Sequence, residues 1–168
     1  MKKFKLSHFE EIIIDQLEEY YKAEFEFMDT KLSIDLNFKG KKLPVEVFQS
    51  IELLITDMVN QDEKNRVHIA SDYNAVDGDT VKEFMEFHIE EMSEELAPMV
   101  DFENKNVNPE VQLMEKLKLV RIGFYLDGKY DSSSFATFDY SVGRELSDQL
   151  IVVNVDKKGE LLNLAWES

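Results

Sequence analysis

The last third of the chain alternates between apolar and polar positions. Four such runs cover residues 119–126, 135–142, 149–155 and 161–166, and turn-forming residues separate them. Alternation with a period of two is typical of β-strands, and short connections place neighbouring strands antiparallel. We therefore predict a four-stranded meander. Its third strand, apolar on both faces, is expected to lie inside the sheet.

One charged pair is predicted within this meander. A turn centred near Tyr130 places Arg121 opposite Asp139 on the polar face. Opposite charges that face each other across two strands stabilise the pairing. We interpret Arg121 and Asp139 as a structural cross-strand pair, and we expect Trp166 to pack the last strand onto the sheet.

A second alternating region near the N-terminus predicts a hairpin. Residues 24–29 and 32–38 both alternate, and a turn at residues 29–31 joins them so that one face meets water. The hairpin ends at Gly40 and Pro44, which interrupt strand structure.

Residues 9–14 fit either a helix or a strand. Ser7-x-x-Glu10 is typical of a capping box that opens a helix, whereas three consecutive isoleucines at 12–14 favour a strand. We favour a strand that is followed by a short helical turn through Tyr21.

Apolar residues at steps of three and four predict three helices in the middle of the chain. Residues 45–60 carry the clearest spacing, and residues 63–73 carry a weaker one. The third helix is expected to begin at the capping box Thr80-x-x-Glu83. Residues 101–110 are predicted to form a loop.

Together these elements predict an α+β fold in a single domain, residues 1–168. A chain of this length can bury one sizeable core. The domain divides into an N-terminal strand and hairpin (1–40), a helical middle (44–97) and the meander (117–168). We expect the N-terminal hairpin and the meander to form one antiparallel sheet, with the three middle helices packed on one face.

The most distinctive charge pattern lies on the third predicted helix and the residues beside it. Residues 77–103 contain a single cation, Lys82, and ten carboxylates: Asp77, Asp79, Glu83, Glu86, Glu90, Glu91, Glu94, Glu95, Asp101 and Glu103. This local excess contributes over half of the formal net charge of −16. A surface of one sign attracts a partner of the opposite sign or serves solubility.

The candidate partner-binding residues are five glutamates of this helix: Glu86, Glu90, Glu91, Glu94 and Glu95. The first, second and fourth of these lie four positions apart, and so do the third and fifth. Like charges at that spacing destabilise a helix by about 0.2–0.5 kcal/mol per pair. This spacing of the glutamates therefore lowers the stability of the helix.

Composition excludes several classes of function. The chain has no cysteine, so disulfides, thiolate metal sites and cysteine nucleophiles are ruled out. A sequence pI near 4.5 disfavours nucleic acid and anionic lipid as partners. No apolar run approaches the length of a membrane span, so we predict a cytoplasmic protein with no membrane partner.

A calcium-binding loop is not predicted. Asp72, Asn74 and Glu83 match positions 1, 3 and 12 of an EF-hand loop, but Val76 and Asp77 occupy positions 5 and 6, where an oxygen ligand and a glycine are required. A capping role for Glu83 explains its position better.

The histidines supply the alternative of an enzyme or a metal-binding module. His68 precedes Asp72 by four residues and His88 precedes Glu91 by three, but Met85 stands where a Glu-x-x-His metal motif needs a glutamate. We interpret His88 as a histidine at the edge of the core, bonded to a neighbour. The sequence contains no nucleophile elbow and no glycine-rich phosphate loop, so no catalytic residue, metal ligand or cofactor is assigned.

Several blocks of the chain resemble a bacterial family of unknown function, domain of unknown function two-thousand-and-four. The blocks are LVRIGFY (119–125), FDYSVG (138–143), SDQLIVV (147–153), Gly159, Glu167-Ser168 and, in the hairpin, SIDLNF (33–38). The resemblance implies a bacterial cytosolic α+β domain without established catalytic residues. Small acidic domains of this general kind often accompany toxin genes as immunity proteins.

We therefore expect a non-enzymatic acidic protein that binds a basic partner, as an immunity-type or inhibitory protein does. Two alternatives remain open. One is an enzyme or metal-binding module that uses His68, His88 and nearby carboxylates. The other is a homo-oligomeric structural domain.

Overall fold

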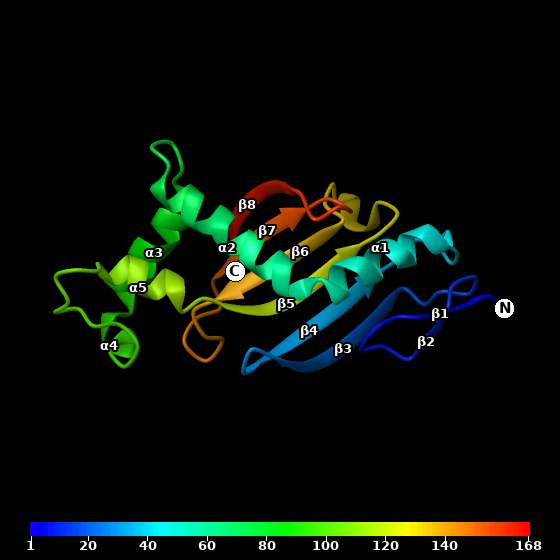
Figure 1. Ribbon diagram of the computed structural model, residues 1–168, viewed down its shortest axis with the longest axis horizontal. Coiled ribbons are helices and arrows are strands. Elements are labelled where there is room, and N and C mark those ends of the chain that lie inside the picture. The colour runs from blue at the N-terminus through cyan, green and yellow to red at the C-terminus, as the bar shows by residue number, and fades with distance from the viewer.

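A six-stranded mixed sheet forms the centre of the protein in a computed structural model that describes residues 1–168. Neighbouring strands are antiparallel except for one parallel pair, β4 and β5 (Figure 1). The strands lie side by side in chain order: β3 (Tyr20–Phe27), β4 (Thr30–Asn37), β5 (Lys118–Tyr125), β6 (Ala136–Ser141), β7 (Leu150–Val155) and β8 (Leu161–Glu167).

The predicted hairpin and the predicted meander are both present, and the fold is α+β. The wet face expected for the hairpin is absent from β4, where Ser33, Asp35 and Asn37 are buried. The prediction of a wholly antiparallel sheet is wrong. β4 and β5 run parallel, with Ile34 opposite Ile122. The chain leaves the C-terminal end of β4, passes through the helices and re-enters the sheet beside the N-terminal end of β4. Such a crossover makes the two strands parallel.

Five helices separate β4 from β5. They are α1 (Val45–Thr56), α2 (Met58–Asn74), α3 (Thr80–Glu91), α4 (Ser93–Leu96) and α5 (Pro109–Glu115). In the view of Figure 1, α1 and α2 cross in front of the sheet, whereas α3, α4 and α5 gather at one end of the molecule.

Several helix boundaries differ from the prediction. The first two helices meet at Asp57, not between residues 60 and 63. The acidic helix is interrupted at Met92, whose φ of −132° and ψ of 27° are not helical. The end of the predicted loop 101–110 belongs to α5, which Asn108 caps by accepting a hydrogen bond from the Val111 N–H at 2.9 Å.

The capping box predicted at Thr80 and Glu83 is also wrong, because Thr80 is already the first helical residue. A side chain from α2 takes the place of the cap. The Oδ2 atom of Asp72 accepts a hydrogen bond from the Val81 N–H at 2.9 Å and so satisfies a free donor at the start of α3.

The N-terminal segment contains a small second sheet of β1 (Lys3–Lys5) and β2 (Glu11–Ile13). Residues 11–13 are therefore a strand, but the helical turn expected through Tyr21 is absent, because β3 begins at Tyr20. The backbone between β2 and β3 bonds elsewhere: the Leu17 N–H donates to the Lys41 oxygen at 2.8 Å.

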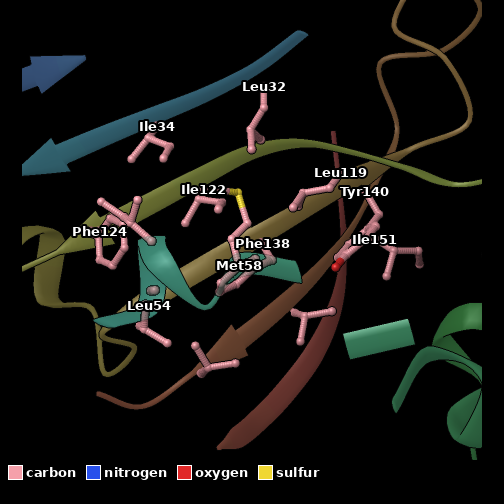
Figure 2. Close-up of a cluster of buried hydrophobic side chains, with 14 of the residues drawn as sticks. Leu32, Ile34, Leu54, Met58, Leu119, Ile122, Phe124, Phe138, Tyr140 and Ile151 are labelled. Carbon is pink, nitrogen blue, oxygen red and sulfur yellow. The ribbon is translucent and has the colours of Figure 1, made fainter. Parts of the chain in front are cut away.

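One hydrophobic cluster of 33 buried residues joins the sheet to the helices. On the sheet, the inward side chains include Ile34, Ile122 and Phe138, each at most 1 % exposed. Leu54 from α1 and Met58 from α2 pack against them (Figure 2). β7 is buried on both of its faces, as predicted for an inner strand.

No helix of the protein has the length and apolar character needed to span a bilayer.

Candidate functional site

The carboxylates of residues 77–103 lie on α3, on α4 and on the segments beside these helices, and we call this set the acidic ridge. Of the candidate partner-binding residues, Glu90, Glu91, Glu94 and Glu95 are exposed, and Glu86 is half-buried. None of the carboxylates of the ridge forms an ion pair with a cation of the protein. The ridge therefore presents uncompensated negative charge.

The break at Met92 changes the geometry that the sequence predicted for the ridge. Glu86 and Glu90 share one helix, but Glu94 and Glu95 lie on α4 after the break. The repulsion expected between helical neighbours therefore applies to Glu86 and Glu90. Glu91 is the last residue of α3, so its neighbour at this spacing, Glu95, also lies beyond the break.

The outward face of the sheet carries a different charged group, which we call the arginine cluster: Asp35, Asn37, Arg121, Tyr125 and Asp139. The Nε and Nη2 atoms of Arg121 donate to Oδ1 and Oδ2 of Asp35 at 2.7 and 2.9 Å. Its Nη1 atom donates to Oδ2 of Asp139 at 3.0 Å, and Nη2 also donates to the Tyr125 hydroxyl at 2.7 Å. The predicted pair is present, but Asp35 makes more bonds to Arg121 than Asp139 does.

A glycine makes room for this arrangement. A Cβ atom at Gly123 would lie 2.5 Å from Nη2 and 2.9 Å from Cζ of Arg121. The guanidinium therefore lies over the backbone of β5 at the one position without a side chain. A glycine in the middle of a strand, two residues after an arginine, is the sequence signal for this close approach.

Burial and hydrogen bonding set the ionisation of the arginine cluster. Burial alone would lower the pKa of the Arg121 guanidinium, but its hydrogen bonds to Asp35 and Tyr125 raise that pKa overall. At Asp139, which is 4 % exposed, burial raises the pKa of the carboxyl and outweighs the attraction of Arg121. Asp35 is thus the principal counter-ion of Arg121.

The sheet edge beside this cluster also pairs its charges. Lys22 and Lys31 lie 2.7 and 2.8 Å from the two carboxylate oxygens of Glu24. Their hydrogen bonds lower the pKa of Glu24 to about 2. These side chains are exposed, so the pairing adds little to stability.

A second polar network, buried between α2 and the sheet, had no clear signal in the sequence. The Tyr140 hydroxyl donates to Oδ1 of Asp62 at 2.7 Å and accepts from Nδ2 of Asn65 at 3.3 Å. The Nε atom of Arg66 donates to Oδ2 of Asp62 at 3.1 Å. Gln61 extends the network by donating to the Gly159 oxygen at 3.0 Å. Burial raises the pKa of the Tyr140 hydroxyl well above its usual value, so it stays protonated as a donor.

His88 is fully buried on α3, and its hydrogen bonds define its tautomer. Its Nδ1 atom lies 2.8 Å from the Phe84 carbonyl oxygen, which can only accept, so Nδ1 carries the proton. Nε2 is therefore an acceptor, and the Ser147 hydroxyl donates to it at 2.9 Å. Burial lowers the pKa of His88 and favours this neutral form. No pattern in the sequence indicates the contact with Ser147, which lies on another part of the chain.

The histidines do not assemble a metal site. No group of three or more His, Asp and Glu side chains in the protein is arranged to hold a metal ion. The Nε2 atom of His68 is buried without a hydrogen-bond partner. His88 is engaged with Phe84 and Ser147 and not with a carboxylate.

A surface hollow lies next to the acidic ridge, between residues 97–104 and α5. It has a volume of about 700 Å³ and is lined by Met99, Phe102 and Val107 together with polar side chains. The arginine cluster and the His88–Ser147 contact do not line this hollow.

Comparison with protein families, with curated proteins and with solved structures finds no match for the chain.

Proposed function

We propose that this protein is a non-enzymatic acidic binding protein whose acidic ridge docks a basic protein, in the manner of an inhibitory or immunity-type protein. The observation that carries the proposal is the contrast in pairing. Arg121, Lys22 and Lys31 neutralise carboxylates on the sheet, whereas the carboxylates of the ridge have no cation partner. A dense field of one sign speeds association with a partner of opposite charge.

The same charge defines the class of partner. The ridge repels phosphate groups, so nucleic acid and anionic membranes are unsuitable partners. We further propose that the protein acts in the cytoplasm without a cofactor, and that its middle helices pack on one face of the sheet. The resemblance to domain of unknown function two-thousand-and-four stays a prediction.

Neutralising the ridge tests the proposal. The variant changes Glu86, Glu90, Glu91, Glu94 and Glu95 together to glutamine. Its control carries five Glu→Gln changes at exposed glutamates that form no ion pair and lie outside the ridge: Glu10, Glu18, Glu26, Glu46 and Glu63. Both variants have the same net charge, so a difference between them reports the position of the charges.

The probe is a peptide of eight lysines, titrated by fluorescence anisotropy at several salt concentrations. We expect the control to bind like the unmodified protein and the ridge variant to bind about tenfold more weakly, with a flatter salt dependence. Equal loss of binding in both variants would contradict the proposal, because net charge alone would then explain the affinity.

A physiological partner can be sought with the same pair of variants. A protein retained from a host lysate by the unmodified chain and by the control, but lost with the ridge variant or in high salt, would support the proposal. A partner that the ridge variant retains equally well in high salt would count against it.

A further inference from the structure

The hollow beside the acidic ridge exposes apolar side chains that the fold itself does not use. Phe102 and Val107 are each 36 % exposed, and both line the hollow with Pro98 and Met99. The hollow begins directly after α4, which carries Glu94 and Glu95. Apolar and acidic surfaces therefore meet at this end of the molecule.

The loop that forms the hollow is held in shape by one side chain of α5. The Oε1 atom of Gln112 accepts a hydrogen bond from the backbone N–H of Asp101 at 2.8 Å. Its Nε2 atom donates to the backbone carbonyl oxygens of Asp101 and Val107 at 2.9 Å each. Asn104 adds a local turn by accepting from the Asn106 N–H at 2.9 Å. These bonds satisfy the backbone within the loop, so the hollow is formed before any ligand arrives and binding loses less entropy.

The charges around the hollow have one dominant sign. Asp101, Glu103 and Glu115 line it against a single cation, Lys116. None of these four side chains forms an ion pair within the protein. Charge complementarity therefore selects a cationic occupant, and the exposed ring of Phe102 favours an aromatic side chain as its apolar part.

We propose that the hollow receives an aromatic side chain of the basic partner, flanked by lysine or arginine residues that face Asp101 and Glu103. This inference rests on the proposed function, because the same partner would lie along the ridge. The ridge then supplies attraction at long range, and the hollow supplies the contact that distinguishes one basic protein from another.

Two peptides of equal charge test the inference. Each has six lysines, three on either side of a central residue, which is serine in one peptide and tryptophan in the other. Labelled peptides are titrated at low salt by fluorescence anisotropy. We expect the tryptophan peptide to bind about tenfold more tightly, because partial burial of a large apolar side chain contributes a gain in affinity of this size.

Two single variants, Phe102→Ser and Val107→Ser, should each bring the two peptides to within about twofold of each other. Val76→Ser is the matched control, because Val76 is fully exposed and lies outside the hollow. This variant should keep the full gain from tryptophan. Circular dichroism establishes that the variants are folded.

The outcomes separate the two proposals. If the serine peptide binds through the ridge and tryptophan adds nothing, the inference about the hollow fails and the proposed function stands. If tryptophan adds affinity equally in Phe102→Ser, Val107→Ser and the unmodified protein, the inference also fails. If the serine peptide does not bind, the proposed function fails. If the tryptophan peptide still binds in that case, and its binding depends on Phe102, the hollow is a site for apolar side chains only. If neither peptide binds, both proposals fail.

Discussion

The arginine cluster and the acidic ridge are both rich in carboxylates, but the protein treats their charges in opposite ways. Asp35 and Asp139 are at most 4 % exposed and share Arg121, which lies over Gly123 to reach them. The carboxylates of the ridge have no cation partner, and all of them except the half-buried Glu86 are exposed to water. A buried charge must be paired to be tolerated, whereas an exposed charge is already satisfied by solvent. The first region therefore serves the fold, whereas the charges of the second are not neutralised within the protein.

Removing the cation of the arginine cluster should have the largest effect on stability. Arg121→Met leaves Asp35 and Asp139 buried without their counter-ion, and we expect the free energy of unfolding to fall by about 3–5 kcal/mol. Urea denaturation measures the change. Arg144→Met is the control, since Arg144 is exposed and makes a single long hydrogen bond of 3.4 Å. A loss below about 1 kcal/mol in Arg121→Met would show that the cluster is not needed for the fold.

The buried network under α2 should show a smaller loss. Tyr140→Phe removes the hydroxyl that donates to Asp62, although Arg66 still contacts the other carboxylate oxygen. We expect a decrease of about 1–3 kcal/mol in the free energy of unfolding, because a buried acceptor loses one partner. The exposed Tyr130 supplies the matched change, Tyr130→Phe, which should leave stability unaltered. Equal effects of the two changes would contradict this reading.

The third prediction concerns pH. Burial lowers the pKa of His88 in the folded protein, so the unfolded chain binds a proton at higher pH than the folded chain does. The contribution of His88 is complete above pH of about 6.5 and is lost as the pH falls from there toward the folded pKa, by at most about 1.4 kcal/mol per pH unit. Urea denaturation between neutral and acidic pH measures the slope.

A paired variant isolates this slope from the titration of the many carboxylates. His88→Gln should remove part of the acid sensitivity, whereas His8→Gln, at an exposed position, should retain it. An unchanged slope in His88→Gln would assign the acid sensitivity to other groups.

The acidic ridge should give the smallest effect, of opposite sign. Changing Glu90 to glutamine breaks no ion pair and relieves repulsion with Glu86, which lies one turn away on α3. We expect the free energy of unfolding to change by less than about 0.5 kcal/mol, toward greater stability, and the change to shrink in high salt. A marked loss of stability would show that Glu90 has an internal role and would remove the contrast between the two regions.

Periodicity predicted the strands because their pattern is local. The hairpin of β3 and β4 and the meander of β5–β8 each depend on alternation and short turns, which the sequence displays directly. The parallel join of β4 and β5 depends on the path of the helices between them, which no local pattern reveals. This omission also hid Asp35, since its contact with Arg121 exists only when β4 lies beside β5.

The site residues divide in the same way. The exposure of Glu90, Glu91, Glu94 and Glu95 follows from their charge, so their place on the surface was predictable. The network on α2 was not, because Asp62 and Asn65 are buried on a helix whose polar composition indicates a solvated surface. Ser147 also escaped prediction, since its partner His88 is distant in the sequence.

The parallel seam between β4 and β5 has a consequence for the order of folding. Arg121 and Asp35, which bridge this seam, are 86 positions apart in the chain, whereas every other pair of neighbouring strands in the sheet is joined by a much shorter segment, the longest being residues 126–135. Contacts between distant segments form slowly because a long loop must first close. We therefore expect the hairpin of β3 and β4 and the meander of β5–β8 to form separately. The ion pair between Arg121 and Asp35 should form in the last step, when β4 pairs with β5.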